Sequence, residues 1–119
     1  MYDHLTLKIR DLQASLRFYR RVLEPLGHVL ASSDETSAGL GPEGAPAFWL
    51  LVRPTEPTRS VHIAFRARDR AAVEAFHRAG LANGGRDNGA PGPRRDYGPT
   101  YYAAFLFDPD GNNIEAVHC

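Results

Sequence analysis

Residues 4–9 alternate between polar and apolar side chains, with a period of two. The two faces of this segment carry Leu5, Leu7 and Ile9 on one side and His4, Thr6 and Lys8 on the other. Such alternation is typical of a β-strand that buries one face. The sequence therefore predicts a strand here, with its polar face turned away from the core.

A helical spacing of apolar residues follows directly. Asp11 is a suitable N-cap, and Pro25 and Gly27 end the pattern. The apolar positions that recur at helical spacing are Leu12, Leu16, Tyr19 and Leu23. One strand followed by one helix is the predicted unit.

This unit occurs twice, because residues 62–85 align with residues 4–27 without a gap. The identical pairs are His4 and His62, Arg10 and Arg68, Asp11 and Asp69, Ala14 and Ala72, Phe18 and Phe76, Arg20 and Arg78, Leu23 and Leu81, and Gly27 and Gly85. The second copy predicts a strand over 61–66 and a helix that begins after Asp69 and carries Val73, Phe76 and Leu81 on its apolar face. A repeated unit implies a paired architecture with equivalent positions in each half.

The remaining segments complete two similar modules. Strands are predicted over 28–32, 36–41 and 47–52 in the first module, before a linker from Pro54 to Pro57. The glycine- and proline-rich residues 83–99 are predicted to form a loop, and strands over 101–107 and 113–118 flank a turn at 108–111. We therefore expect an α+β fold in a single domain over 1–119, with paired β-α-β-β-β modules at 1–53 and 60–119. If the apolar faces of the strands pack beneath the two helices, the helices lie on the outer face of the sheet and its other surface is concave.

Composition excludes several functional classes. Fourteen basic and fourteen acidic side chains cancel in a chain of 119 residues, so the net charge favours neither nucleic acid nor an anionic membrane as a partner. No apolar run approaches the roughly 20 residues that a membrane span needs, and residues 1–4 lack the features of a signal segment. We expect a cytoplasmic protein whose function depends on a local site. The single cysteine, Cys119, excludes an intrachain disulfide.

Three residues with metal-binding side chains fall on the predicted polar faces of three strands. They are His4, His62 and Glu115, and all three would project from the concave surface of the sheet if the apolar faces pack beneath the helices. Two imidazoles and one carboxylate hold a divalent transition metal and leave positions open for a substrate. Each residue alone is consistent with an ordinary strand histidine or an exposed glutamate. The repeat symmetry and the strand parity together favour a metal site that takes Mn, Fe, Ni, Co or Zn.

Several segments resemble the vicinal oxygen chelate superfamily, which includes glyoxalase I, extradiol dioxygenases, fosfomycin-resistance transferases and bleomycin-resistance proteins. The similar segments, spread over essentially the whole chain, are DHLTL at 3–7, DLxxSxxFY at 11–19, VHIAF at 61–65 and DPDGNNIE at 108–115. The resemblance implies a cupped sheet of paired modules around a metal, with His4, His62 and Glu115 as ligands. It also implies a homodimer, because short members of the superfamily usually assemble as dimers.

The predicted site has three protein ligands rather than four. Aligning the modules places Phe48 or Trp49 opposite Glu115, where glyoxalase I enzymes of this superfamily carry a carboxylate or amide ligand. Neither aromatic side chain binds a metal. A three-ligand site suits a substrate that chelates the ion through two adjacent oxygens.

Candidate substrate contacts come from two arguments. The resemblance to the fosfomycin-resistance transferases implies Thr6 and Trp49, although their tyrosine before the turn is Phe105 here. Strand parity places Tyr101 and Phe105 on the cavity face, and Arg95 in the preceding loop is available to an anion.

Two functions remain open from the sequence. The first is a metal-dependent enzyme that acts on a small oxygen-chelating molecule by lyase or isomerase, dioxygenase or thiol-transferase chemistry. The alternative is a non-catalytic small-molecule-binding or resistance protein with an aromatic cavity around Trp49, Tyr101 and Phe105. The bleomycin-sequestering members of the superfamily generally lack the metal triad, so its presence here favours the enzyme.

Overall fold

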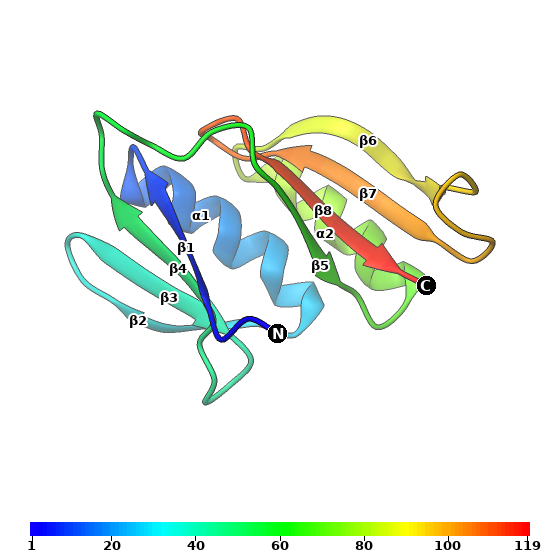
Figure 1. Cartoon of the computed structure of the whole chain (residues 1–119), viewed down its shortest axis with the longest axis horizontal. Helices are drawn as coiled ribbons and strands as arrows, with labels where there is room; N and C mark the ends of the chain where they lie inside the picture. Colours follow the sequence, from blue (N-terminus) through cyan, green and yellow to red (C-terminus); the bar gives the residue numbers. More distant parts are fainter.

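The computed structural model describes residues 1–119 and contains two β-α-β-β-β modules (Figure 1). The first module consists of β1 (Leu5–Ile9), α1 (Leu12–Leu23), the short 3-10 helix η1 (Glu24–Leu26), β2 (Val29–Ser33), β3 (Ser37–Gly41) and β4 (Phe48–Val52). The second consists of β5 (His62–Arg66), α2 (Arg70–Ala82), β6 (Arg86–Pro93), β7 (Tyr102–Phe107) and β8 (Asn113–His118). The α+β class and the pairing of equivalent modules are confirmed. Neither module contains a helix with the length and apolar character of a membrane span.

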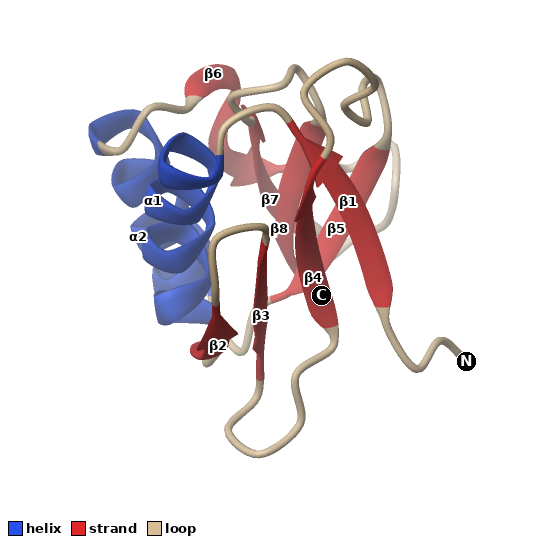
Figure 2. Cartoon of the chain, turned by 90° about the vertical axis from the view of Figure 1, so that its left-hand side faces the viewer, coloured by secondary structure: helices blue, strands red, loops and turns tan.

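The strands form two four-stranded mixed sheets, with the orders β1-β4-β3-β2 and β5-β8-β7-β6. In each sheet the first strand pairs in parallel with the last, and the other pairs are antiparallel. The edge strands β1 and β5 lie nearest the junction between the sheets (Figure 1). Both helices pack on one side of the sheets, and no helix covers the other side (Figure 2). The candidate ligands lie on β5, on β8 and directly before β1.

Both helices begin at the predicted caps. The Asp11 carboxylate accepts a hydrogen bond from the Ala14 N–H at 3.3 Å, and the Asp69 carboxylate accepts one from the Ala72 N–H at 2.8 Å. These side chains satisfy backbone donors that have no partner within the helix. Because a cap fixes where each helix starts, it also fixes the end of the strand before it.

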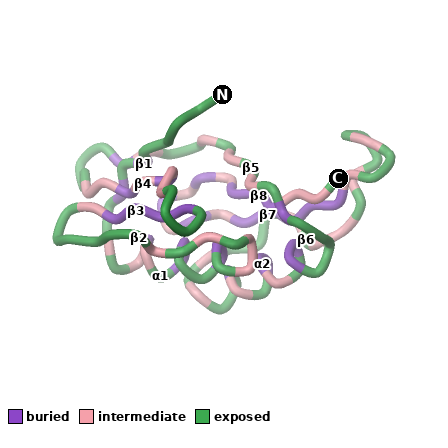
Figure 3. Tube along the Cα trace, turned by 90° about the horizontal axis from the view of Figure 1, so that it is seen from below, coloured by how far each residue is buried: buried purple, intermediate pink, exposed green.

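One cluster of buried side chains joins the two modules beneath the helices. Phe18 and Tyr19 of α1 and Phe76 of α2 are fully buried in it, and Figure 3 shows buried positions along the central strands β3, β4, β7 and β8. The prediction that Leu81 lies on the apolar face of α2 is wrong, since its side chain is exposed. Gly80 takes the inward position instead and lies directly against Leu106.

Residues 86–93 form the strand β6, so the predicted loop over 83–99 is wrong in this part. The strand pairs only with β7, and its register shifts on both sides of Gly89, where φ is 152°. An edge strand tolerates proline because one side of its backbone needs no partner, and a bulge accommodates glycine. The same composition that suggested a loop therefore suits an irregular edge strand.

The turn after β7 is buried and connects distant segments. Asp108 is 2% exposed, and its carboxylate accepts hydrogen bonds from the Tyr19 hydroxyl of α1 and from the Asn112 side-chain amide. The amide of Asn112 also donates to the backbone carbonyl of Thr58, the residue that follows the linker. The predicted turn is confirmed, and it additionally ties the second module to the first module and to the residue after the linker.

Candidate metal site

His62 and Glu115 come together on the neighbouring parallel strands β5 and β8. Glu115 on β8 pairs with Ala64, which lies two residues after His62 on β5. The His62 Nε2 atom is 2.7 Å from Glu115 Oε1. Glu115 is only 1% exposed, whereas about half of the His62 side chain is exposed, at 52%. The imidazole thus lies between a buried carboxylate and the solvent.

The second carboxylate oxygen of Glu115 has a different partner. The Tyr101 hydroxyl donates a hydrogen bond of 2.5 Å to Oε2. Burial, together with this hydrogen bond, raises the pKa of Tyr101 to about 12, so the phenol keeps its proton at neutral pH. Phe105 pairs with Glu115 across β7 and β8, and its ring centre is 6.1 Å from that of His62.

No arginine or lysine compensates the charge of Glu115, whose only ion-pair partner is His62. The nearby Arg94 guanidinium lies over the Phe105 ring and donates to the backbone carbonyls of Ala90 and Gly92, at 2.7 and 2.8 Å. A buried carboxylate is costly unless a cation or several donors accompany it. Apart from His62 and Tyr101 the Glu115 carboxylate has no side-chain partner, so a cation next to His62 would further offset the cost of its burial.

The donor atoms suit a divalent transition metal. Ligand atoms about 2.1 Å from one ion lie about 3 Å apart when they subtend about 90° at the ion. His62 Nε2 and Glu115 Oε1 form a hydrogen bond of 2.7 Å, so the two atoms lie near enough to each other to bind one ion. An imidazole nitrogen and a carboxylate oxygen are also the ligand types that Mn, Fe, Ni, Co and Zn accept.

His4 lies in the other module and does not join this pair. No three side chains among histidine, cysteine, aspartate and glutamate come close enough within one chain to hold a metal. The His4 Nδ1 atom is 2.7 Å from the carboxylate of Asp3, which leaves Nε2 free. Metal-binding histidines commonly have such a carboxylate on the other ring nitrogen. The sequence interpretation missed Asp3, and its position directly before His4 is the one signal that could have suggested it.

The first module carries Trp49 where the second carries Glu115. Thr6 pairs with Trp49 in the same way that Ala64 pairs with Glu115, whereas Phe48 is buried in the core. The register thus shows that Trp49, and not Phe48, occupies the position equivalent to Glu115. The Trp49 indole lies against Gly39.

The residues predicted to contact the substrate lie in different parts of the structure. Thr6 and His62 line one groove of about 530 Å³ between β1 and β5. Arg95 is exposed in the loop before β7. Tyr101 and Phe105 surround Glu115 in the second module, whereas Trp49 is in the sheet of the first.

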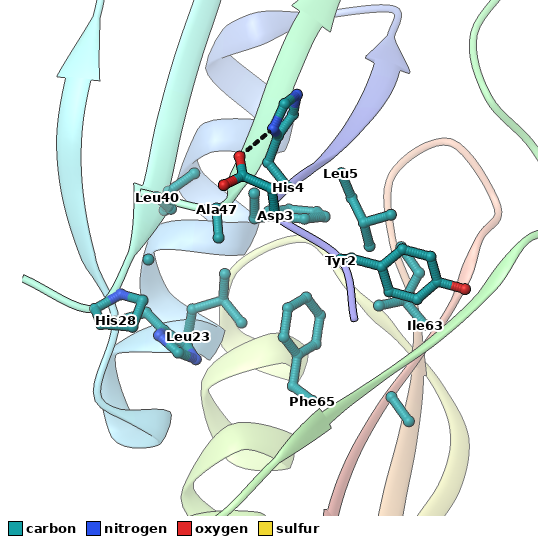
Figure 4. A pocket seen from close by; sticks show the side chains of 14 residues that line it. Tyr2, Asp3, His4, Leu5, Leu23, His28, Leu40, Ala47, Ile63 and Phe65 are labelled. Carbon is teal, nitrogen blue, oxygen red and sulfur yellow. Dashed lines mark hydrogen bonds and ion pairs between the residues drawn. The ribbon is translucent and has the colours of Figure 1, made fainter. Parts of the chain in front are cut away.

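A separate apolar pocket of about 240 Å³ lies between the modules (Figure 4). Leu40 and Phe48 line it from the first module, and Ile63 and Phe65 line it from the second. His28 also lines it, and burial lowers the pKa of this histidine, so its imidazole is neutral at pH 7. Tyr2, Asp3 and His4 border the same pocket (Figure 4).

Comparisons with known proteins agree with this architecture. A family model described as the Glyoxalase/Bleomycin resistance protein/Dioxygenase superfamily matches residues 2–116. The solved structure of a glyoxalase/bleomycin resistance protein from Albidiferax ferrireducens is 31% identical, with a TM-score of 0.87 over 100% of this chain and 98% of that chain. No protein of curated function matches the sequence.

More distant solved structures share the fold. A bleomycin resistance determinant encoded on the transposon Tn5 is 21% identical, with a TM-score of 0.64 over 95% of this chain and 92% of that chain. A mutant of glyoxalase I from Zea mays is 24% identical, with a TM-score of 0.70 over 96% of this chain and 44% of that chain. At these identities the similarity shows the architecture alone.

Proposed function

The chain belongs to the glyoxalase/bleomycin resistance protein/dioxygenase superfamily, and we propose that it is a divalent-metal-dependent enzyme that acts on a small oxygen-chelating molecule. The observation that carries this proposal is the buried Glu115 carboxylate, whose only ion-pair partner is the His62 imidazole. Removing a carboxylate from water is unfavourable, and a bound cation offsets that cost.

We propose further that two copies of the chain build the site together. His62 and Glu115 supply two ligands, while His4 of the same chain lines a different hollow. Since a catalytic metal site commonly has three protein ligands, a third must come from elsewhere. His4 of a second copy fits this role, because its Nε2 atom is free and Asp3 orients its ring. A homodimer with twofold symmetry would then contain two equivalent sites.

The side chains around this site have distinct tasks in the proposed reaction. A bound metal supplies a Lewis acid that polarises a substrate oxygen and stabilises negative charge on it. Phe105 and the buried sheet exclude water from one side of Glu115, while the exposed part of His62 marks the side from which substrate approaches. Thr6 lies in the groove next to His62 and is available to donate a hydrogen bond to the substrate.

Metal binding by chelator-stripped protein tests the proposal. We expect at least one of Mn, Fe, Ni, Co and Zn to bind in calorimetry, and the His62→Ala and Glu115→Gln variants to lose this binding by at least about 100-fold. His118→Ala is the matched control, because the His118 ring is hydrogen-bonded to the backbone carbonyl of Ala67 and not to His62 or Glu115. The proposal fails if the wild type binds none of these ions, or if His62→Ala binds them as tightly as the wild type.

One observation supports a non-catalytic binding protein as the second candidate. The apolar pocket between the modules is large enough for a small molecule and does not include His62 or Glu115. Binding of an apolar dye that persists in EDTA and in His62→Ala but is lost in Phe65→Ala would favour this alternative. Loss of dye binding on metal removal would instead favour the metal enzyme.

A further inference from the structure

We infer that Tyr101 is a positioning residue for Glu115, which it restricts to binding a metal through one oxygen. The Tyr101 hydroxyl occupies Oε2 at 2.5 Å, while Oε1 faces His62 at 2.7 Å. This inference rests on the proposed metal site. The Tyr101 hydroxyl thus holds the Glu115 carboxylate, whereas the sequence predicted that Tyr101 contacts the substrate.

The loop before β7 holds Tyr101 by its backbone on both sides. The Arg94 N–H donates to the Tyr101 carbonyl at 2.8 Å, and the Tyr101 N–H donates to the Gly98 carbonyl at 3.4 Å. The Tyr97 ring meets the Tyr101 ring edge to face, with centres 5.3 Å apart. These contacts hold the backbone of Tyr101 and pack its ring, so the position of the hydroxyl does not depend on Glu115 alone.

The carboxylate has no stronger donor that would displace the phenol. The Arg94 guanidinium is engaged with backbone carbonyls, and no ion pair joins Glu115 to an arginine or lysine. The Tyr101 hydroxyl is thus the hydrogen-bond partner of Oε2, and the His62 ring is the partner of Oε1.

A carboxylate held in this way is restricted as a ligand. A free carboxylate binds a cation through one or both oxygens, and ions such as Ca²⁺ commonly take both. Partners of metal ligands orient them, and their removal typically reduces metal affinity about 10- to 100-fold. Tyr101 would thus fix both the orientation of Glu115 and the number of oxygens that it contributes.

Co²⁺ binding to Tyr101→Phe tests this role without an activity assay. We expect the Kd for Co²⁺ to rise about 10- to 100-fold relative to the wild type. The visible absorption of the Co²⁺ complex should also change, because a second carboxylate oxygen becomes available. Tyr97→Phe is the matched control, since Tyr97 stacks on Tyr101 and forms no bond to Glu115. Its affinity and spectrum should equal those of the wild type.

An infrared difference spectrum between Co²⁺-loaded and metal-free wild type provides a second measurement that does not depend on the folding of Tyr101→Phe. A wide separation between the antisymmetric and symmetric carboxylate stretches, absent in Glu115→Gln, indicates ligation through one oxygen and supports the inference. A narrow separation in the wild type overturns it, as does an unchanged affinity and spectrum in Tyr101→Phe. Failure of the wild type to bind Co²⁺ or any other divalent metal is a different result, which overturns the proposed function and this inference with it.

Discussion

At the scale of single residues, the proposed site depends most on Glu115. Its carboxylate is 1% exposed, and its oxygens are shared between an imidazole and a phenol. Strand alternation predicted the face on which Glu115 lies, because side chains of a strand change sides at every residue. Alternation does not report burial depth, which depends on the loop and strand that cover that face. The pairing with Tyr101 therefore became visible only in three dimensions.

The tyrosine hydrogen bond predicts how stability changes at alkaline pH. The pKa of Tyr101 is about 12 in the folded chain, against 10.0 for the ordinary side chain. Its contribution to stability is therefore complete below about pH 10 and is lost as the pH rises towards 12. Measured by urea unfolding, the unfolding free energy should fall less between pH 8 and pH 11 in Tyr101→Phe than in the wild type. Equal losses in both proteins would contradict this interpretation.

Gly39 gives a second prediction at this scale. A Cβ atom at position 39 would lie 2.5 Å from the Trp49 ring, so Gly39→Ala must displace the indole. We expect a loss of about 1 to 3 kcal/mol in unfolding free energy. A shift in the emission of the single tryptophan should accompany it.

The matched control for this prediction is Gly98→Ala, whose new Cβ would meet its nearest neighbour at an ordinary 3.8 Å. If Gly39→Ala leaves both the stability and the fluorescence unchanged, the close packing of Trp49 on β3 is incorrect.

At the scale of secondary-structure elements, local patterns predicted both helices and most strands. Helix caps and alternating strands depend on residues close in sequence, and the caps at Asp11 and Asp69 form as expected. β6 was missed because its glycines and prolines resemble a loop, and only its pairing with β7 makes it a strand. The inward position of Gly80 likewise could not be predicted from local sequence, since it depends on Leu106 of β7.

The buried turn after β7 should be the most sensitive connection between elements. Asp108→Asn replaces an acceptor oxygen with a donor that faces other donors, so we expect a loss of about 2 to 4 kcal/mol in unfolding free energy. Tyr19→Phe removes one hydroxyl donor from the same carboxylate and should cost about 1 to 2 kcal/mol. Denaturant titration measures both values.

An exposed aspartate provides the control for the turn. Asp96→Asn lies in the surface loop before β7 and should change the stability by less than about 0.5 kcal/mol. An Asp108→Asn variant as stable as Asp96→Asn would show that the buried network does not hold the modules together.

At the scale of the whole molecule, the repeat explains the architecture and its broken symmetry explains the site. His4 and His62 are equivalent in the two modules, whereas Trp49 and Glu115 occupy equivalent positions with different chemistry. A sequence repeat identifies equivalent positions but not how the two copies are placed relative to each other. This is why the sequence predicted three candidate ligands on one surface, while a single chain brings together only two of them.

Metal binding by mixed dimers of His4→Ala and His62→Ala tests the central claim most directly. In a mixed dimer, His4 of the His62→Ala chain faces the intact His62 and Glu115 of the His4→Ala chain, which restores one of the two sites. Refolding the variants together in equal amounts makes half of the dimers mixed, so about a quarter of the wild-type metal capacity should return. Metal content that stays at the average of the two separate variants would contradict a site built by two copies.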